Sequence, residues 1–256
     1  MTATDDHKTV LVTGAGRRLG RAIALDLAAH GWTVGVHYLS SRDDADSVVR
    51  EIADAGGSAS AIQADLADLD DTKSLVQRTV DTIGPLACLI NNASLFEMDT
   101  VETVTPESWH AHLDINLRAP AMLTQDFAAQ LPAGADGNVI NILDQRVWRL
   151  TPYFLSYTAA KSGLWALTRT TAMGLAPRIR VNAIGPGPTL PSSRQSEEQF
   201  EAQCRSTPLG RGASPAEICT AVRFILDMPS MTGQMIALDG GQHLAWKPAD
   251  SDNSTE

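Results

Sequence analysis

Tyr157 and Lys161 are two residues whose types and spacing could perform acid–base chemistry. They stand four positions apart in the sequence YTAAK, within the apolar, helix-forming run 156–175. A spacing of four places both side chains on one face of a helix, where an ammonium group can lower the pKa of a phenol. The pair predicts a proton donor that works near neutral pH. Because this spacing is also common by chance, the rest of the chain must distinguish a catalytic pair from a surface lysine beside a packed tyrosine.

A glycine-rich turn lies between the first predicted strand and the first predicted helix. Residues 9–12 are β-branched or apolar, TGAGRRLG begins at Thr13, and a helical pattern covers residues 19–30. Glycine allows a tight turn and a close approach of a ligand to the backbone, and the N-terminus of a helix attracts an anion. The turn therefore predicts a pyrophosphate site, which comprises Gly14, Gly16, Arg17, Arg18, Leu19 and Gly20.

The end of the second predicted strand, residues 33–38, indicates which dinucleotide binds. In a dinucleotide-binding fold this strand end lies beside the adenine ribose, and a carboxylate there binds the 2′-OH of NAD. This strand instead ends in His37 and Tyr38, and no carboxylate occurs before Asp43. Arginine and serine side chains suit a 2′-phosphate. We therefore predict NADP(H) as the cofactor, with its phosphate bound near Arg17, Arg18, His37, Tyr38, Ser40 and Arg42.

Strands and helices alternate along the rest of the chain. Further strands are predicted at 58–63, 87–90, 137–143, 180–184 and 234–238, and helices at 43–55, 71–83, 105–131, 156–175 and 215–227. This alternation predicts an α/β fold of the Rossmann type, a doubly wound parallel sheet with helices on both faces. Ligands of such a sheet bind beyond the carboxyl ends of its strands, where Asp65 and Asn91 are expected to contact the cofactor.

Two segments and one asparagine allow more than one interpretation. Residues 185–191 are too rich in Pro and Gly for regular structure, and the polar segment 192–204 is either a short amphipathic lid helix or a solvated insertion. Asn116 lies inside a predicted helix, where asparagine has a low propensity. A polar task, such as holding a water molecule or a backbone bend, and an idle exposed side chain both remain open.

The composition excludes several classes of function. The chain has 256 residues and a formal net charge of -10, and it has no cluster of Lys and Arg that would bind nucleic acid. Its three cysteines form no CxxC pair, and none of its apolar runs approaches the ~20 residues that cross a bilayer. We predict a cytoplasmic protein with no membrane segment and no metal site. Its single domain would span residues 8–246, between a flexible N-terminus (1–7) and a polar tail (247–256).

Six features in one order resemble those of the short-chain dehydrogenase/reductase family. They span about residues 8–245 and are TGAGRRLG at 13, NNA at 91, Asn116, YTAAK at 157, RVNAIGPGP at 180 and LDGG at 238. The resemblance implies that Tyr157 donates a proton, that Lys161 binds the nicotinamide ribose and depresses the pKa of Tyr157, and that Asn116 holds a water of the proton relay. It also implies cofactor contacts from Leu66, Ala93, Pro186 and Gly187.

The family usually assembles as homotetramers, through its long helices and its C-terminal segment. The apolar faces of residues 116–131 and of the predicted Tyr157 helix fit such an assembly. Near the C-terminus, His243, Leu244 and Trp246 would then either close the pocket of a neighbouring subunit or pack at the interface. The resemblance thus predicts a homotetramer.

Two positions depart from the family pattern. Arg18 stands where the glycine-rich signature usually has Gly, so clearance around the backbone of the turn is reduced. Asp144 stands thirteen residues before Tyr157, where the family normally has a catalytic Ser. A carboxyl group can replace a neutral hydroxyl only if its pKa is raised or a water relays the proton.

An aspartate at this position is typical of the pteridine reductase branch of the family. TGAGRRLG, VHYLSS at 36 and NNASLF at 91 are similar to segments of that branch. There a Phe stacks on the pterin, and the Arg of the turn and a Ser approach it, which here would be Phe96, Arg17 and Ser94. The resemblance implies reduction of a pterin or dihydropterin. Hydride would pass from NADPH to a ring carbon, and Tyr157 or Asp144 would protonate the adjacent nitrogen.

Two other functions stay open. A different short-chain reductase would act on a ketone, a sugar or a 3-oxoacyl thioester, and its turnover would survive the substitution Asp144→Ser. A catalytically silent NADPH-binding sensor with this fold would bind NADPH without oxidising it on any substrate. The intact Tyr157, Lys161 and Asn116 argue against the sensor.

Overall fold

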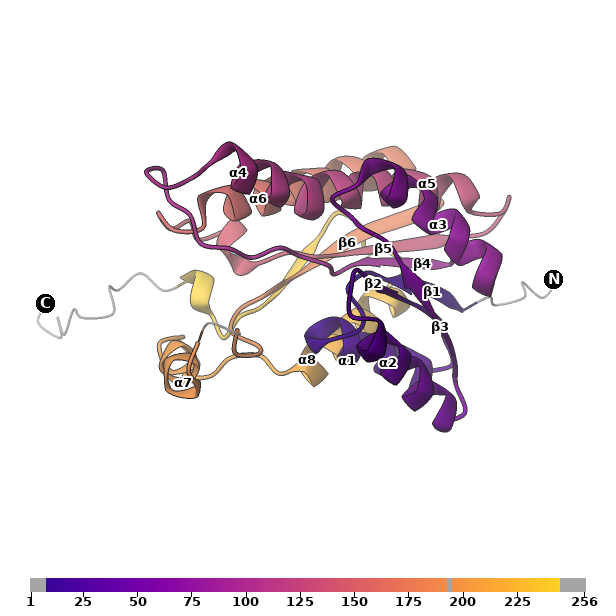
Figure 1. Cartoon of the computed structure of the whole chain (residues 1–256), viewed down its shortest axis with the longest axis horizontal. Coiled ribbons are helices and arrows are strands. Elements are labelled where there is room, and N and C mark those ends of the chain that lie inside the picture. The colour runs from indigo at the N-terminus through magenta and orange to yellow at the C-terminus, as the bar shows by residue number, and fades with distance from the viewer. Residues whose placement is uncertain (1–7, 193–194, 245–256) are drawn as a thin grey trace, which may run out of the picture.

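A seven-stranded parallel sheet forms the centre of the protein in the computed structural model, which describes residues 8–192 and 195–244 (Figure 1). The strands lie in the order β3–β2–β1–β4–β5–β6–β7. Their bounds are β1 (Thr9–Val12), β2 (Thr33–Tyr38), β3 (Ser58–Gln63), β4 (Cys88–Asn91), β5 (Gly137–Ile142), β6 (Ile179–Pro186) and β7 (Met235–Leu238). This arrangement confirms the predicted doubly wound fold.

The strand order reverses between β1 and β4. From β1 the chain adds β2 and β3 on one side, then returns to add β4 and the later strands on the other side. Val12 near the end of β1 has Val36 of β2 as one neighbour and Ile90 of β4 as the other. The two halves of the sheet diverge at this point, so a crevice opens beyond the carboxyl ends of β1 and β4.

Helices cover both faces of the sheet. One face carries α1, α2 and α8, and the opposite face carries α3, α4, α5 and α6 (Figure 1). A further helix, α7, lies beyond the carboxyl ends of the strands. The bounds are α1 (Arg18–Ala29), α2 (Arg42–Asp54), α3 (Leu69–Ile83), α4 (Pro106–Leu113), α5 (Ala119–Gln130), α6 (Leu155–Leu175), α7 (Glu197–Arg205) and α8 (Pro215–Asp227).

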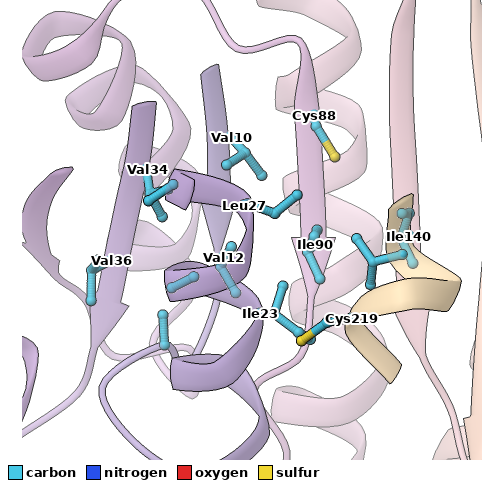
Figure 2. Packing of buried hydrophobic residues seen from close by; sticks show 14 of the residues in the cluster. Val10, Val12, Ile23, Leu27, Val34, Val36, Cys88, Ile90, Ile140 and Cys219 are labelled. Atoms are coloured by element: carbon cyan, nitrogen blue, oxygen red, sulfur yellow. The ribbon is translucent and has the colours of Figure 1, made fainter. Parts of the chain in front are cut away.

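The two cores follow from the alternation of side chains along each strand. Val10 and Val12 of β1 pack with Ile23 of α1 and Cys219 of α8 on one face (Figure 2). Leu11, between the two valines, belongs to the core on the other face, under α3 and α5. Because both faces are covered, β1 is buried along its whole length, and its sequence is almost continuously apolar.

Several helix starts follow from short-range hydrogen bonds that the sequence predicts. Thr105 caps α4, with Pro106 as the first helical residue, and its hydroxyl accepts the N–H of Ser108. Ser214 caps α8 in the same way, through a capping box with Glu217. Within the described residues, no helix is long and apolar enough to cross a membrane.

Two predictions about irregular segments need correction or completion. Gly185 and Pro186 were expected in a loop, but they extend β6 and lie opposite Ala237 and Leu238 of β7. The neighbouring strand β5 ends at Ile142, so β6 has only β7 beside it here and tolerates the missing N–H of proline. Of the two alternatives for the segment 192–204, a short helix or a solvated insertion, the described residues contain the helix. This helix is α7, which is capped by Ser196 and has no buried residue.

Candidate active site

A cavity of about 770 Å³ opens beyond the carboxyl ends of the strands, at the crevice between β1 and β4. Most of the predicted site residues line it. They are Gly14, Arg17, Arg18, Leu19, Gly20, His37, Asp65, Leu66, Ala93, Ser94, Phe96, Asp144, Tyr157, Lys161, Pro186 and Gly187. The other predicted residues, Gly16, Tyr38, Ser40, Arg42, Asn91 and Asn116, are not among its lining residues in the described part of the chain.

Tyr157, Lys161 and Asp144 converge at the inner end of this cavity. Asp144 follows β5, while Tyr157 and Lys161 lie one turn apart near the start of α6. The Tyr157 hydroxyl donates to Asp144 Oδ2 at 3.1 Å, and the Lys161 ammonium donates to the carbonyl of Ile142 at 2.8 Å. The phenol and the carboxyl group therefore share a hydrogen bond at the place where a proton would be delivered.

The glycine-rich turn presents an uncapped helix N-terminus to the cavity. Arg17 is the N-cap of α1, but no side chain caps the first turn, which also has no acidic residue. Gly14 has a φ of +64°, and a Cβ there would lie 3.1 Å from Cα of Ala93. A Cβ at Gly20 would lie 2.2 Å from the carbonyl oxygen of Gly14. Free N–H groups and a close backbone approach suit an anionic phosphate.

The predicted arginines take different positions at the rim. Arg17 forms an ion pair with Asp44, and Arg42 forms one with Asp46 at 3.3 Å, so both guanidinium groups lie against α2. Arg18 points the other way and donates to the carbonyl oxygens of Leu190 and Pro191, at 3.2 and 2.6 Å. Its φ of 53° is in the left-handed region, where the family signature has glycine. Arg18 thus joins the turn to the segment that precedes α7.

His37 and Thr13 hold the turn against the sheet. The N–H of Gly14 donates to Nδ1 of His37 at 2.9 Å, so the proton of the ring is on Nε2, which donates to Ala64 O at 3.1 Å. Burial lowers the pKa of His37 to about 4, which keeps the ring neutral. The Thr13 hydroxyl accepts the N–H groups of Asn92 and Ala93, each at 2.9 Å. His37 therefore positions backbone in addition to lining the cavity.

An aromatic stack borders a second cavity of about 530 Å³, and one of its rings, Phe96, also lines the main cavity. The rings of Phe96 and Phe154 are parallel, with centroids 4.3 Å apart, and the edge of Tyr157 meets Phe96 at 4.7 Å. The guanidinium of Arg146 lies 4.8 Å from the centroid of Phe154. Residues of α7 line the second cavity, together with residues that follow Asp144. This side of the site is suited to a flat ring with a substituent.

Comparisons with known proteins match nearly the whole chain. A family profile described as enoyl-(acyl carrier protein) reductase matches residues 14–243. A 3-oxoacyl-[acyl-carrier-protein] reductase from Synechocystis sp. is 34% identical over 238 residues, which are 91% of this chain and 96% of the relative. The chain belongs to the short-chain dehydrogenase/reductase family. The resemblance drawn from its motifs is confirmed at this level, and the protein is an oxidoreductase.

Two solved structures of the family bear on the site. FolM alternative dihydrofolate reductase 1 from Brucella suis, in complex with NADP, is 50% identical, with a TM-score of 0.92. The match covers 94% of this chain and 97% of that one. The angucycline C-6 ketoreductase LanV with bound NADP is 32% identical, with a TM-score of 0.86 and coverage of 93% and 96%. Reductases with very different substrates therefore share this architecture.

The pKa of Tyr157 is shifted in the direction opposite to the family expectation. Lysine was expected to depress it, but burial raises the pKa of Tyr157 well above 10, and the charge and hydrogen bond of Asp144 raise it further. The Lys161 ammonium lies 5.7 Å from the centroid of the ring, and burial lowers its own pKa to about 8. Burial also raises the pKa of Asp144. The phenol is thus protonated at neutral pH.

Asn116 and Asn91 hold backbone and strands rather than lining the cavity. Asn116 lies in a π-helical turn, Asp114–Arg118, between α4 and α5, so the backbone bend that its low propensity allowed is present. Its amide donates to Leu95 O and accepts from Leu95 N–H, both at 2.8 Å. Asn91 is buried and donates to Asn141 Oδ1 at 2.8 Å. The water-holding role of Asn116 stays a prediction.

Three residues of the substrate side were missed by the sequence interpretation. Arg146 and Phe154 lie in the segment between Asp144 and α6, which has no periodic pattern, and Gln145 lines the second cavity beside them. An arginine and an aromatic residue close to a predicted site residue were the available signal. His243, by contrast, packs within its own chain, on Asp239 and Trp148, while Leu244 is exposed. Trp246 lies outside the described residues, as do the predicted terminal segments 1–7 and 247–256.

Proposed function

We propose that the protein is an NADPH-dependent reductase of a pterin or dihydropterin. The observation that carries the proposal is the contact of 3.1 Å between Tyr157 Oη and Asp144 Oδ2, beside the aromatic stack of Phe96 and Phe154. A carboxyl group stands where this family normally uses a neutral hydroxyl. The substrate must therefore be one that benefits from a carboxyl group at the site of proton transfer.

The cofactor side of the site fits NADPH. The uncapped first turn of α1 supplies N–H groups for the pyrophosphate, and the absence of an acid at the end of β2 leaves room for a 2′-phosphate. Arg17 and Arg42 would exchange their partners Asp44 and Asp46 for that phosphate. The NADP in the Brucella suis FolM and LanV structures supports this assignment. When bound, NADPH supplies the hydride.

The residues around Tyr157 explain how the proton is handled. With its pKa raised well above 10, Tyr157 keeps its proton until a base approaches, and the raised pKa of Asp144 allows the carboxyl group to share that proton. A pterin ring offers both a nitrogen that accepts a proton and N–H donors that a carboxylate can bind. Lys161 would hold the ribose hydroxyls and orient the nicotinamide. Phe96, Ser94 and Arg18 border the space that remains for the ring.

We propose Arg18, rather than Arg17, as the arginine that contacts the substrate. It lines both cavities and reaches the segment before α7, whereas Arg17 lines only the main cavity and pairs with Asp44. We accordingly move the proposed substrate contact of the turn from Arg17 to Arg18. The FolM relative, which carries the name alternative dihydrofolate reductase and is 50% identical, supports a ring of the pterin class.

A second candidate is the reduction of a 3-oxoacyl thioester or another ketone. The name of the Synechocystis relative favours it, as does that of the ketoreductase LanV. The geometry argues against it. Reduction of a ketone passes negative charge to the carbonyl oxygen, and a carboxylate 3.1 Å from the Tyr157 hydroxyl would oppose that charge.

One assay separates these candidates and the silent sensor. NADPH oxidation is followed by absorbance with dihydrobiopterin, dihydrofolate, acetoacetyl thioester and a panel of ketones. The pterin proposal expects kcat/KM for a dihydropterin to exceed that for the thioester by at least about 100-fold. Asp144→Ser should lower the dihydropterin value by about 100-fold, since the shared proton is lost.

The isosteric Asp144→Asn is the matched variant, because it keeps the shape of the side chain and removes only its acid function. Equal loss in both variants ties the effect to the carboxyl group. Retained or improved turnover of Asp144→Ser would favour the ketone candidate. NADPH binding without oxidation on any substrate would favour the sensor.

A further inference from the structure

A buried hydrogen-bond cluster joins the start of α6 to the segment that carries Phe96. Its members, which we call the Asp99 cluster, are Asp99, Ser108, His112 and Ser156. Asp99 is 3% exposed, and His112 and Ser156 are completely buried. None of these residues lines either cavity described above. A cluster of polar groups at this depth is costly unless every partner is in place.

Asp99 caps the first turn of α6 from a distant part of the chain. Its carbonyl oxygen accepts the N–H groups of Phe154 and Leu155, at 2.8 and 3.3 Å, and its Oδ1 accepts the N–H of Ser156 at 3.1 Å. The N-cap residue itself, Phe154, has a left-handed backbone and offers no side-chain cap. A substitution at position 99 keeps the backbone carbonyl and its two bonds, so the side chain of Asp99 is responsible for the bond to the Ser156 N–H and for the bonds that its carboxylate accepts from hydroxyl groups.

The Asp99 carboxyl group is held in its ionised form. Burial alone would raise its pKa, but hydrogen bonds from Ser156 and Ser108 outweigh burial and lower it. Oδ2 accepts the hydroxyl of Ser108 at 3.1 Å and the hydroxyl of Ser156. A negative charge at the N-terminus of a helix is also favoured by the helix dipole.

His112 connects the cluster to the backbone next to Phe96. The N–H of Glu97 donates to Nε2 of His112 at 3.1 Å, so the ring carries its proton on Nδ1, which faces Ser156 Oγ at 2.8 Å. The Ser156 hydroxyl then donates to Asp99. This order differs from a nucleophilic Ser–His–Asp arrangement, in which the histidine accepts the proton of the serine. The cluster is therefore suited to holding elements in place.

The Asp99 cluster holds together the start of α6, which carries Tyr157, and the segment that carries Phe96. Tyr157 directly follows Ser156, and the edge of the His112 ring meets the Tyr157 ring at 6.3 Å. Phe96 lies three residues before Asp99, and its partner Phe154 donates its N–H to Asp99. A shift of Asp99 would therefore move the phenol and the aromatic stack relative to each other.

We propose that Asp99 is a positioning residue, which fixes the start of α6 so that the Tyr157 hydroxyl stays aligned with Asp144 and with the ring on Phe96. The proposal rests on Tyr157 being the proton donor, as in the proposed function, but not on which substrate is reduced. Asp99 acts through Tyr157 and touches neither cofactor nor substrate. Replacing Asp99 should therefore lower turnover only in a protein that has Tyr157.

A double-mutant cycle of Asp99→Asn with Tyr157→Phe tests this dependence. The substrate is whichever of dihydrobiopterin or acetoacetyl thioester the wild type reduces. Asp99→Asn should lower kcat about 10- to 100-fold, with the Kd for NADPH unchanged, because small misplacements of a reacting group are costly. In the Tyr157→Phe protein the same substitution should change the residual turnover less than about 2-fold. An equal loss in both backgrounds would overturn the proposal.

Two further variants keep the test decisive. Glu102→Gln removes a carboxylate from the same segment, but Glu102 is exposed, so its turnover should equal that of the wild type. Ser156→Ala removes one hydroxyl of the cluster and leaves its N–H, and it takes the place of Asp99→Asn if that variant does not fold. If the wild type reduces neither substrate, a crystal structure of the variant decides. An unchanged Tyr157–Asp144 contact of 3.1 Å would then refute the positioning role.

Discussion

The cofactor side and the substrate side of the cavity are built in different ways. The cofactor side is one continuous unit of strand, turn and helix, β1 and α1, which His37 and Thr13 tie to the neighbouring strands. The proposed substrate side combines residues from three parts of the chain that are far apart in the sequence: 94–98, 144–154, and 188–192 with 195–203. The carbonyl oxygen of the buried Asp99, next to the first of these parts, accepts the N–H of Phe154 at the end of the second.

This difference separates a part that many reductases share from a part that sets the substrate. A phosphate needs free N–H groups and close backbone approach, which a short local motif supplies. Recognition of a ring needs a flat surface and a proton donor in register, and we propose that Phe96 and Tyr157, which lie on different segments, supply them. The relatives reflect the same division, since FolM and LanV are both described with NADP but carry names for different substrates.

The largest effect that we expect on the cofactor side comes from His37. Its pKa is lowered to about 4 from 6.5, so the folded protein binds this proton more weakly than the unfolded chain does. The stabilisation is complete above pH 6.5 and is lost as the pH falls from 6.5 toward 4, by about 3 kcal/mol in total. The substitution His37→Asn removes the titrating ring, and this dependence on pH should disappear with it.

Thermal unfolding at pH 7 and pH 5 measures this contribution. The asparagine variant keeps an acceptor for the Gly14 N–H, so the turn should still bind NADPH at pH 7. Its melting temperature should fall less than that of the wild type between the two pH values. If the melting temperature fell equally in both proteins, protonation of His37 would not be the cause of the lower stability at pH 5.

The cofactor side was largely predictable from the sequence, because its signals are local. The TGAGRRLG turn and the absence of an acid after Tyr38 each depend on neighbours within a few residues. Parallel strands also follow from the alternation of elements, since long crossovers leave few other arrangements. The sheet order and both cores follow from this pattern.

The substrate side was predictable only in part. Asp144 and Phe96 were found by resemblance, but Phe154 and Arg146 lie in a segment without periodicity, and their stacking depends on the left-handed backbone at Phe154. The raised pKa of Tyr157 likewise depends on burial and on the close approach of Asp144, not on the spacing to Lys161. Burial and long-range contacts have no signature in a five-residue motif.

Arg18 lines both cavities, and its left-handed backbone allows the strain of the turn to be measured. A left-handed φ of 53° strains any residue with a Cβ by about 1–2 kcal/mol, while glycine loses roughly 0.4–1 kcal/mol through the entropy of the unfolded chain. Arg18→Gly should therefore unfold with a free energy about 0.5–1 kcal/mol above that of Arg18→Ala. Urea denaturation measures the difference.

The matched control is Arg21, an ordinary position inside the same helix. There the order should reverse, with Arg21→Gly about 1 kcal/mol less stable than Arg21→Ala. Both Arg18 variants should also raise the KM for the ring substrate, because they lose the bonds to Leu190 and Pro191. The same order at both positions would show that the turn relaxes around Arg18 without strain.

The smallest effect concerns the ion pair of Arg17 with Asp44 at the rim. Both side chains are exposed, so the pair is weak, and Asp44→Asn should tighten NADPH binding only about 2- to 3-fold by freeing the guanidinium for the 2′-phosphate. Binding of NADH, which lacks that phosphate, should not change. Asp43→Asn makes the same change of charge one residue away. If it tightened NADPH equally, net charge would explain the effect, and Arg17 would have no special part in choosing NADPH.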